Sequence, residues 1–126
     1  MKKLVLDTNI VIDFFKNEEQ VISMLKNYNT YYLPVTVCGE LLFGAINSEK
    51  KQQNLKQTRQ FFKTCKILNN TMDVANAYSE IRFELRKKGK PIPENDIWIA
   101  AACLISDLPL YTKDGHFGYI NKLKLV

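Results

Sequence analysis

The sequence lacks any apolar run long enough to span a lipid bilayer, which takes about 20 residues. Its first six residues include only Leu4, Val5 and Leu6 as a continuous apolar stretch before Asp7, far less than the apolar region of a secretion signal. These two absences predict a cytoplasmic protein without a membrane segment.

Cysteine and histidine are scarce. Cys38, Cys65 and Cys103 are odd in number, widely spaced and set among apolar neighbours, as expected for reduced thiols in a core. Neither a disulfide framework nor a zinc knuckle is predicted. His116 is the only histidine, and its turn-like surroundings favour a surface group, or one behind the site, over a general base.

Acidic residues are missing from one long segment. The net charge is +5, and six Lys or Arg residues occur between Lys50 and Met72 without a single acid. Such a field favours a polyanionic partner, although a merely solvated helix face would have the same composition. The candidates for contacts with such a partner are Lys50, Lys51, Lys56, Arg59 and Lys63.

The rest of the composition is that of an ordinary globular protein. Hydrophobic residues make up 46% and charged residues 25% of the 126 positions, and no repeat or linker interrupts them. A chain of this length can bury an adequate core without covalent help. We therefore expect a single domain over residues 1–126.

Strand-like and helix-like patterns alternate along the chain. Strands are predicted over residues 2–6, 31–35, 65–68, 108–112 and 123–126. Helical spacing predicts two short helices between residues 10 and 25, and further helices over about 36–47, 49–64, 71–88 and 96–105, with Thr36 as a candidate N-cap. This alternation predicts an α/β fold, a central parallel sheet flanked by helices, with ligand sites beyond the carboxyl ends of the strands.

Four carboxylates lie at positions where exposure to solvent does not readily account for a charged residue. Asp7 and Asp114 each follow a predicted strand, and Asp96 lies in or next to the first turn of a predicted helix. Glu40 lies among apolar residues of a helix, where an ionised carboxylate loses hydration unless a cation or donor compensates. Its neighbour Gly44 leaves space beside it one turn further on.

Each acid taken singly also has a structural interpretation. Asp7 could cap a helix, Asp96 could interact with a helix dipole, and Asp114 could form an Asx turn. If all four converge, however, their mutual repulsion in a low dielectric requires divalent cations. A site built only from oxygen ligands favours Mg²⁺, with Mn²⁺ as a substitute.

Four segments in order carry a family resemblance that spans nearly the whole chain. They are Leu6-Asp7-Thr8-Asn9, Glu40-Leu41-Leu42-Phe43-Gly44, Pro93-Glu94-Asn95-Asp96-Ile97-Trp98-Ile99-Ala100-Ala101 and Leu110-Tyr111-Thr112-Lys113-Asp114, with Phe117 three residues beyond. Together they resemble the four acidic motifs of PIN-domain nucleases. The compact form resembles the VapC toxins of toxin–antitoxin pairs more than the larger processing nucleases.

The resemblance implies a PIN-like three-layer fold with four to five parallel strands. It further implies a Mg²⁺-dependent endoribonuclease that leaves a 5′-phosphate and a 3′-hydroxyl, a homodimer, and inhibition by a VapB-like antitoxin. By the same resemblance Asp7, Glu40, Asp96 and Asp114 are the catalytic, metal-binding acids. The supporting polar residues it implies are Thr8, Asn9 and Thr112.

Three alternatives remain open at this point. Asp7 could be the nucleophile of an aspartyl-phosphate phosphatase, but Asn9 occupies the position of that class's second Asp. The chain could be a non-catalytic nucleic-acid-binding module that uses the basic segment, although Glu40 would then be unexplained. It could also be a PIN-type RNA-processing nuclease without an antitoxin.

Overall fold

The strands form one parallel sheet. The structure, a computed structural model, describes residues 2–126, and their four strands are β1 (Lys3–Leu6), β2 (Thr30–Pro34), β3 (Lys66–Leu68) and β4 (Leu110–Tyr111). They lie in the order β3-β2-β1-β4, and every neighbouring pair is parallel. The predicted α/β class with a central parallel sheet is confirmed.

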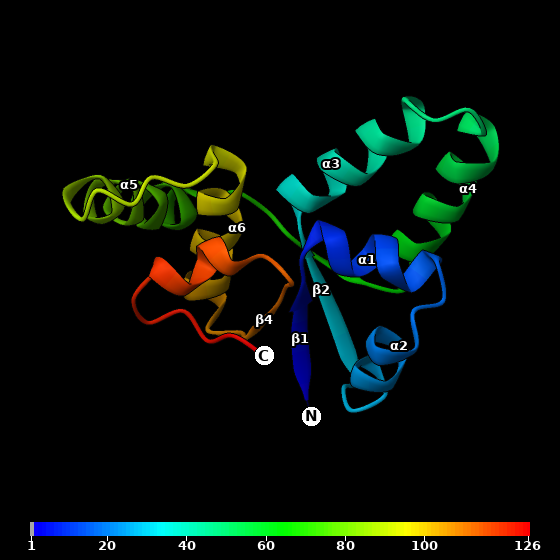
Figure 1. The fold of residues 1–126 in the computed structure, drawn as a ribbon, viewed down its shortest axis with the longest axis horizontal. Helices are drawn as coiled ribbons and strands as arrows, with labels where there is room; N and C mark the ends of the chain where they lie inside the picture. Colours follow the sequence, from blue (N-terminus) through cyan, green and yellow to red (C-terminus); the bar gives the residue numbers. More distant parts are fainter. Residues whose placement is uncertain (1) are drawn as a thin grey trace.

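Helices cover both sides of this sheet. In Figure 1, α1 to α4 lie on one side of the strands, whereas α5, α6 and the short 3-10 helix η1 lie on the other. The three layers match the predicted architecture. The helices are α1 (Thr8–Phe15), α2 (Glu19–Leu25), α3 (Val35–Ile46), α4 (Lys51–Phe62), α5 (Met72–Lys87), α6 (Glu94–Ser106) and η1 (Gly115–Tyr119).

Strand β1 is the point where the strand order reverses. The chain moves from β1 to β2 and β3 on one side, and then crosses to β4 on the other side of β1. In open parallel sheets such a reversal leaves a crevice beyond the carboxyl ends of the strands concerned. Asp7 directly follows β1, and its backbone N–H donates to Tyr111 O at 3.0 Å, so the ends of β1 and β4 are adjacent.

The core explains why β1 is an unbroken apolar run. Leu4, Val5 and Leu6 are fully buried, as expected for a strand covered by helices on both faces. Phe117 is also fully buried and fixes η1 against the core. Among residues 2–126, no helix is both long and apolar enough to cross a membrane.

Two helices begin earlier than predicted. Helix α3 begins at Val35 with Pro34 as its N-cap, so Thr36 lies in the first turn and is not the cap. Helix α6 likewise begins at Glu94, with Pro93 as its N-cap. Both prolines have extended backbone (ψ of 143° and 142°), which a ring-fixed φ permits immediately before a helix. Proline therefore sets both starts without a side-chain cap.

The predicted last strand, residues 123–126, is wrong. This segment makes one isolated parallel bridge, Leu110 to Leu125, with Leu110 N donating to Lys124 O at 2.9 Å. Strand β4 covers only residues 110–111 of the predicted 108–112. Because β4 is so short, it offers too little backbone to pair with a full fifth strand.

The thiols and aromatic rings mostly pack inside the molecule. Burial raises the pKa of Cys38 to about 11 and that of Cys103 to about 12, so both stay as unreactive thiols. Cys65 is only partly buried. Between α5 and α6, the rings of Tyr78 and Trp98 stack with centroids 4.0 Å apart.

Candidate functional site

Asp7 is the buried centre of the site. Only 5% of its surface is exposed, and its carboxylate accepts hydrogen bonds from Thr8 N at 2.8 Å and from Thr112 Oγ1 at 2.6 Å. Burial raises its pKa above the ordinary value, these hydrogen bonds oppose the shift, and the charges of Glu40 and Asp114 add to it. The residue also caps α1, so its structural interpretation holds beside any functional one.

Glu40 reaches the site from α3. Its Oε1 accepts a hydrogen bond from Thr8 Oγ1 at 2.7 Å, which ties it to the residue after Asp7. A cavity of about 620 Å³ lies beside it, and Asn95 of α6 lines the same cavity. A Cβ added at Gly44 would meet nothing within 4 Å, as expected from the space predicted there. Open room for a ligand therefore adjoins Glu40.

Asp96 lies in the first turn of α6, as predicted. Its pKa is raised to about 6 by burial first, and then by the charges of Asp7 and Asp114; a hydrogen bond with His116 opposes the shift. The helix dipole favours the ionised form at this position. The pKa is nevertheless raised, so burial and the neighbouring carboxylates outweigh the favourable interactions.

Asp114 caps η1 from the loop that follows β4. Its Oδ1 accepts the backbone N–H of His116 at 2.9 Å, and its own N–H donates to Thr112 Oγ1 at 3.0 Å. The Asx-turn interpretation is therefore correct for this residue. The turn also fixes its carboxyl group near Asp96, because both contact the same histidine.

The four predicted acids converge. They come from four different elements, yet Asp96 experiences the charges of all three others. Two threonines orient them: Thr112 holds Asp7, and Thr8 bridges Asp7 and Glu40 through its backbone N–H and its hydroxyl. Carboxylates that gather in this way repel one another when no cation lies between them. The arrangement is therefore suited to holding a divalent cation.

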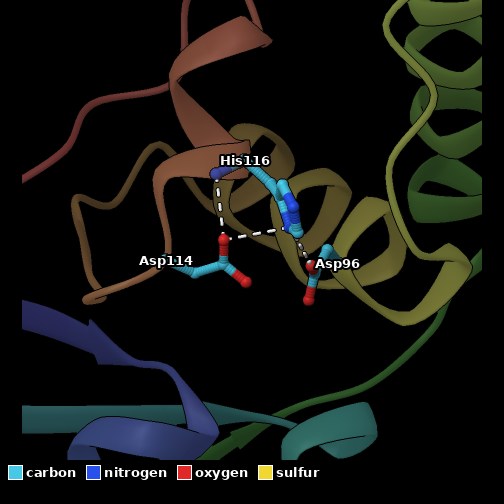
Figure 2. A group of neighbouring side chains, drawn as sticks. All are labelled: Asp96, Asp114 and His116. Atoms are coloured by element: carbon cyan, nitrogen blue, oxygen red, sulfur yellow. Dashed lines mark hydrogen bonds and ion pairs between the residues drawn. The ribbon is translucent and has the colours of Figure 1, made fainter.

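His116 is the residue that the sequence did not place at the site. Its side chain is half exposed, as expected, but its Nδ1 lies 2.9 Å from Asp114 Oδ1 and 3.6 Å from Asp96 Oδ2. Figure 2 shows the imidazole between the two carboxylates. The only sequence signal was its place two residues after Asp114, in a turn anchored by Phe117.

Two polar contacts connect the β4–η1 loop to α1. Asn9 Oδ1 accepts a weak hydrogen bond from Lys113 N at 3.5 Å, and Lys113 Nζ forms an ion pair with Asp13. Asn9 and Asp13 lie one turn apart on α1, so the loop is held at two points on one helix face. Asn9 thus contacts the loop that bears Asp114, and not the carboxylates themselves.

The five basic candidates lie apart from the carboxylates. All are exposed, and they lie on α4 or at its ends. A groove of about 380 Å³ separates the inner face of α4 from Glu40, and none of the five lines it. The residues concerned are Lys50, Lys51, Lys56, Arg59 and Lys63.

Fold and site together define a class of protein. A parallel sheet lies between two layers of helices, and acidic residues lie together at the carboxyl ends of its strands. This is the arrangement expected of PIN domains. The chain belongs to the PIN domain family, which it matches over residues 4–123.

Within that family, VapC ribonucleases are among the similar proteins. Ribonuclease VapC2 of Haemophilus influenzae is 38% identical over 103 residues, which cover 80% of this chain and 78% of that protein. The tRNA(fMet)-specific endonuclease VapC of Salmonella typhimurium is 32% identical over 102 residues, covering 79% and 77%. The solved structure of DNA-bound VapBC from Salmonella typhimurium superposes with a TM-score of 0.92 at 28% identity, covering 100% of this chain and 98% of the other.

Proposed function

We propose that this chain is a Mg²⁺-dependent endoribonuclease and the toxin of a VapBC toxin–antitoxin pair, working as one PIN domain over residues 1–126. The observation that carries the proposal is the convergence of four carboxylates; the pKa of Asp96 among them is raised to about 6, chiefly by burial and further by the charges of the other three. Carboxyl groups with raised pKa values, here those of Asp7 and Asp96, are typical of functional sites. Glu40 in particular lies beside the cavity, and the hydrogen bond from Thr8 orients its carboxylate there.

The residues present fit a divalent cation. Carboxylate oxygens are the ligands that Mg²⁺ and Mn²⁺ prefer, and a cation would relieve the repulsion between Asp7 and Asp96. In this proposal Asp7 and Asp96 hold the principal ion, while Glu40 and Asp114 hold a second ion or position the attacking water. When bound, the metal supplies an activated water and neutralises charge on the phosphodiester.

The chain's own side chains prepare this site. The hydroxyl of Thr112 holds one oxygen of Asp7, and Thr8 holds the other oxygen of Asp7 as well as Glu40, so both carboxylates are oriented before a ligand arrives. The cavity of about 620 Å³ beside Glu40 provides space for the scissile segment. The exposed basic residues of α4 would contact phosphates of the RNA further along.

The partner and substrate follow from the relatives. Salmonella typhimurium and Rickettsia felis proteins of this fold are seen as VapBC complexes, and one relative is named for tRNA(fMet). We therefore propose that the substrate is RNA, and that tRNAs are the first RNAs to test. We propose a VapB-like antitoxin as the inhibitor. We also propose a homodimer, in which the exposed Phe43 on α3 contacts the partner subunit.

Cleavage of RNA by purified protein tests the activity. With Mg²⁺, and also with Mn²⁺, we expect endonucleolytic products from a panel of tRNAs and total RNA, and none after chelation. Glu40→Gln should abolish cleavage, whereas Glu49→Gln, an exposed acid beyond α3, should cut like the parent. Metal-independent RNA binding with no cut in any RNA would favour the binding-module alternative.

Growth tests the assignment as a toxin. Expression of the parent should arrest growth, Glu40→Gln should not, and the product of a small neighbouring gene should relieve the arrest. RNA cleavage in vitro without growth arrest, and without such a neighbour, would favour an RNA-processing nuclease.

A further inference from the structure

His116 lies where a metal ligand would lie. The imidazole Nδ1 is 2.9 Å from Asp114 Oδ1 and 3.6 Å from Asp96 Oδ2. One ligand atom from each of these three residues lies within 4.8 Å of the others. The three side chains come from α6, from the loop after β4 and from η1, and Figure 2 shows them turned toward a common point.

The contact of His116 with Asp114 has the length of a hydrogen bond, and the same spacing also fits two neighbouring ligands of one metal ion. Neighbouring ligands of an octahedral ion, each about 2.1 Å from the metal, are about 3 Å apart. Nδ1 carries at most one proton, so it can donate to only one of its two carboxylate neighbours. A cation among the three groups would satisfy both carboxylates and the nitrogen lone pair together.

The backbone supports this placement. Asp114 accepts the backbone N–H of His116 at 2.9 Å, which fixes the two residues relative to each other. Phe117, the next residue, is fully buried and prevents the turn from shifting. Because the imidazole itself is half exposed, it can adjust to an ion without any change in the core.

We propose that His116 Nδ1 is a nitrogen ligand of the principal ion, the one assigned to Asp96, and that Asp114 binds this same ion and not a second one. This inference rests on the proposed function, because it assumes that those acids bind metal. Its consequence is selectivity: imidazole favours first-row transition ions, whereas Mg²⁺ strongly prefers oxygen. The centre is therefore not purely oxygen-based, and it discriminates in favour of Mn²⁺ more strongly than four carboxylates alone would.

Pulsed electron paramagnetic resonance of bound Mn²⁺ tests the inference directly. Because His116 is the only histidine, labelling with ¹⁵N-histidine marks one imidazole without ambiguity. We expect a nitrogen coupling to Mn²⁺ in the parent and none in His116→Gln. Calorimetry should show that His116→Gln loses Mn²⁺ affinity by about tenfold or more, with a much smaller change for Mg²⁺. Tyr119→Phe, an exposed residue of η1, is the control and should bind both ions like the parent.

The outcomes separate this inference from the proposed function. One outcome is that the parent binds Mn²⁺ and Asp96→Asn does not, while no nitrogen coupling is seen and His116→Gln keeps the parent's ratio of Mn²⁺ affinity to Mg²⁺ affinity. In that case His116 is only an ion-pair partner. The inference is then overturned and the carboxylate site stands. If Asp96→Asn leaves Mn²⁺ binding unchanged, the proposed metal site is wrong, and the inference falls with it.

Discussion

The pKa of Asp96 shows how strongly the site opposes ionisation of its carboxyl groups. Its pKa is raised to about 6 mainly by burial, and further by Asp7 and Asp114. The pKa of Asp7 is raised as well, again chiefly by burial. In the metal-free protein the ionised carboxylates therefore destabilise the fold, and a cation would remove that cost.

Removing the charge of Asp96 should separate stability from function. Asp96→Asn keeps the shape of the side chain and relieves repulsion, so we expect the metal-free variant to melt at the same or a higher temperature than the parent at pH 7. Mg²⁺ affinity and RNA cleavage should fall together. Thermal melting with and without Mg²⁺ checks this. A variant that is less stable, keeps the parent's Mg²⁺-induced shift and still cuts RNA would show that Asp96 is not a ligand.

The pH dependence has a definite sign. The folded-state pKa of Asp96, about 6, lies above the ordinary value of 3.8, so the folded state binds more protons between these limits. The contribution of Asp96 to stability is therefore fully present below about pH 4 and is lost as the pH rises to about 6, by on the order of 3 kcal/mol. Denaturant unfolding of the metal-free parent and of Asp96→Asn, at about pH 4.5 and at about pH 7, measures this loss of stability. An equal pH dependence in the two proteins would contradict the assignment.

At the scale of elements, α4 is an exposed helix with a narrow buried stripe, as predicted. Leu55 and Thr58 are its buried residues, while Phe61 packs against Phe14 and Phe15 with ring centroids 5.4 and 5.5 Å away. The basic side chains consequently all remain free to meet solvent or a polyanion. In the proposed function these side chains contact RNA phosphates and take no part in the chemistry.

Neutralising α4 should change the salt dependence of RNA binding. Replacing Lys51, Lys56 and Arg59 by Gln is expected to weaken binding and to flatten its slope against salt concentration by about 0.7 for each lost phosphate contact. Lys3→Gln is the control, because Lys3 begins β1 at the end opposite Asp7. Binding measured in a catalytically inactive background gives the slopes. An unchanged slope would assign the basic segment to solubility.

The sequence predicts these elements to different degrees, for physical reasons. Helix α5 could be predicted because an uninterrupted apolar spacing ends in basic residues before a glycine. The segment 123–126 could not, because pairing depends on how much backbone β4 offers and not on its own composition. The acids were recognisable from their neighbours. His116 was not, since its direction depends on the burial of Phe117.

At the scale of the molecule, the site lies at the seam between two layers. Glu40 comes from the helices on one side of the sheet, whereas Asp96 and Asp114 come from the other, and Asp7 directly follows strand β1 between them. Neither half contains the whole site. Loosening of either layer would therefore separate the carboxylates before the chain unfolds completely.

Self-association should involve α3. Phe14 and Phe15 pack within the chain, but Phe43 remains 68% exposed and Ile46 51% exposed on the same helix. We expect a homodimer at micromolar concentration, weakened in Phe43→Asp without loss of thermal stability. Phe83→Asp, at a ring on α5 that is 62% exposed, is the matched control and should stay dimeric. Sedimentation that shows a monomeric parent would contradict this prediction.

The stacked pair of Tyr78 and Trp98 has an optical consequence. Trp98 is the only tryptophan of the chain, and it lies two residues after Asp96 in the same helix. Its emission therefore originates from a single place, the contact of α5 with the start of α6. Intrinsic fluorescence should report events at Asp96 without any attached dye, and an unmodified sample can be titrated with an ion, an RNA or a partner protein in the same cuvette.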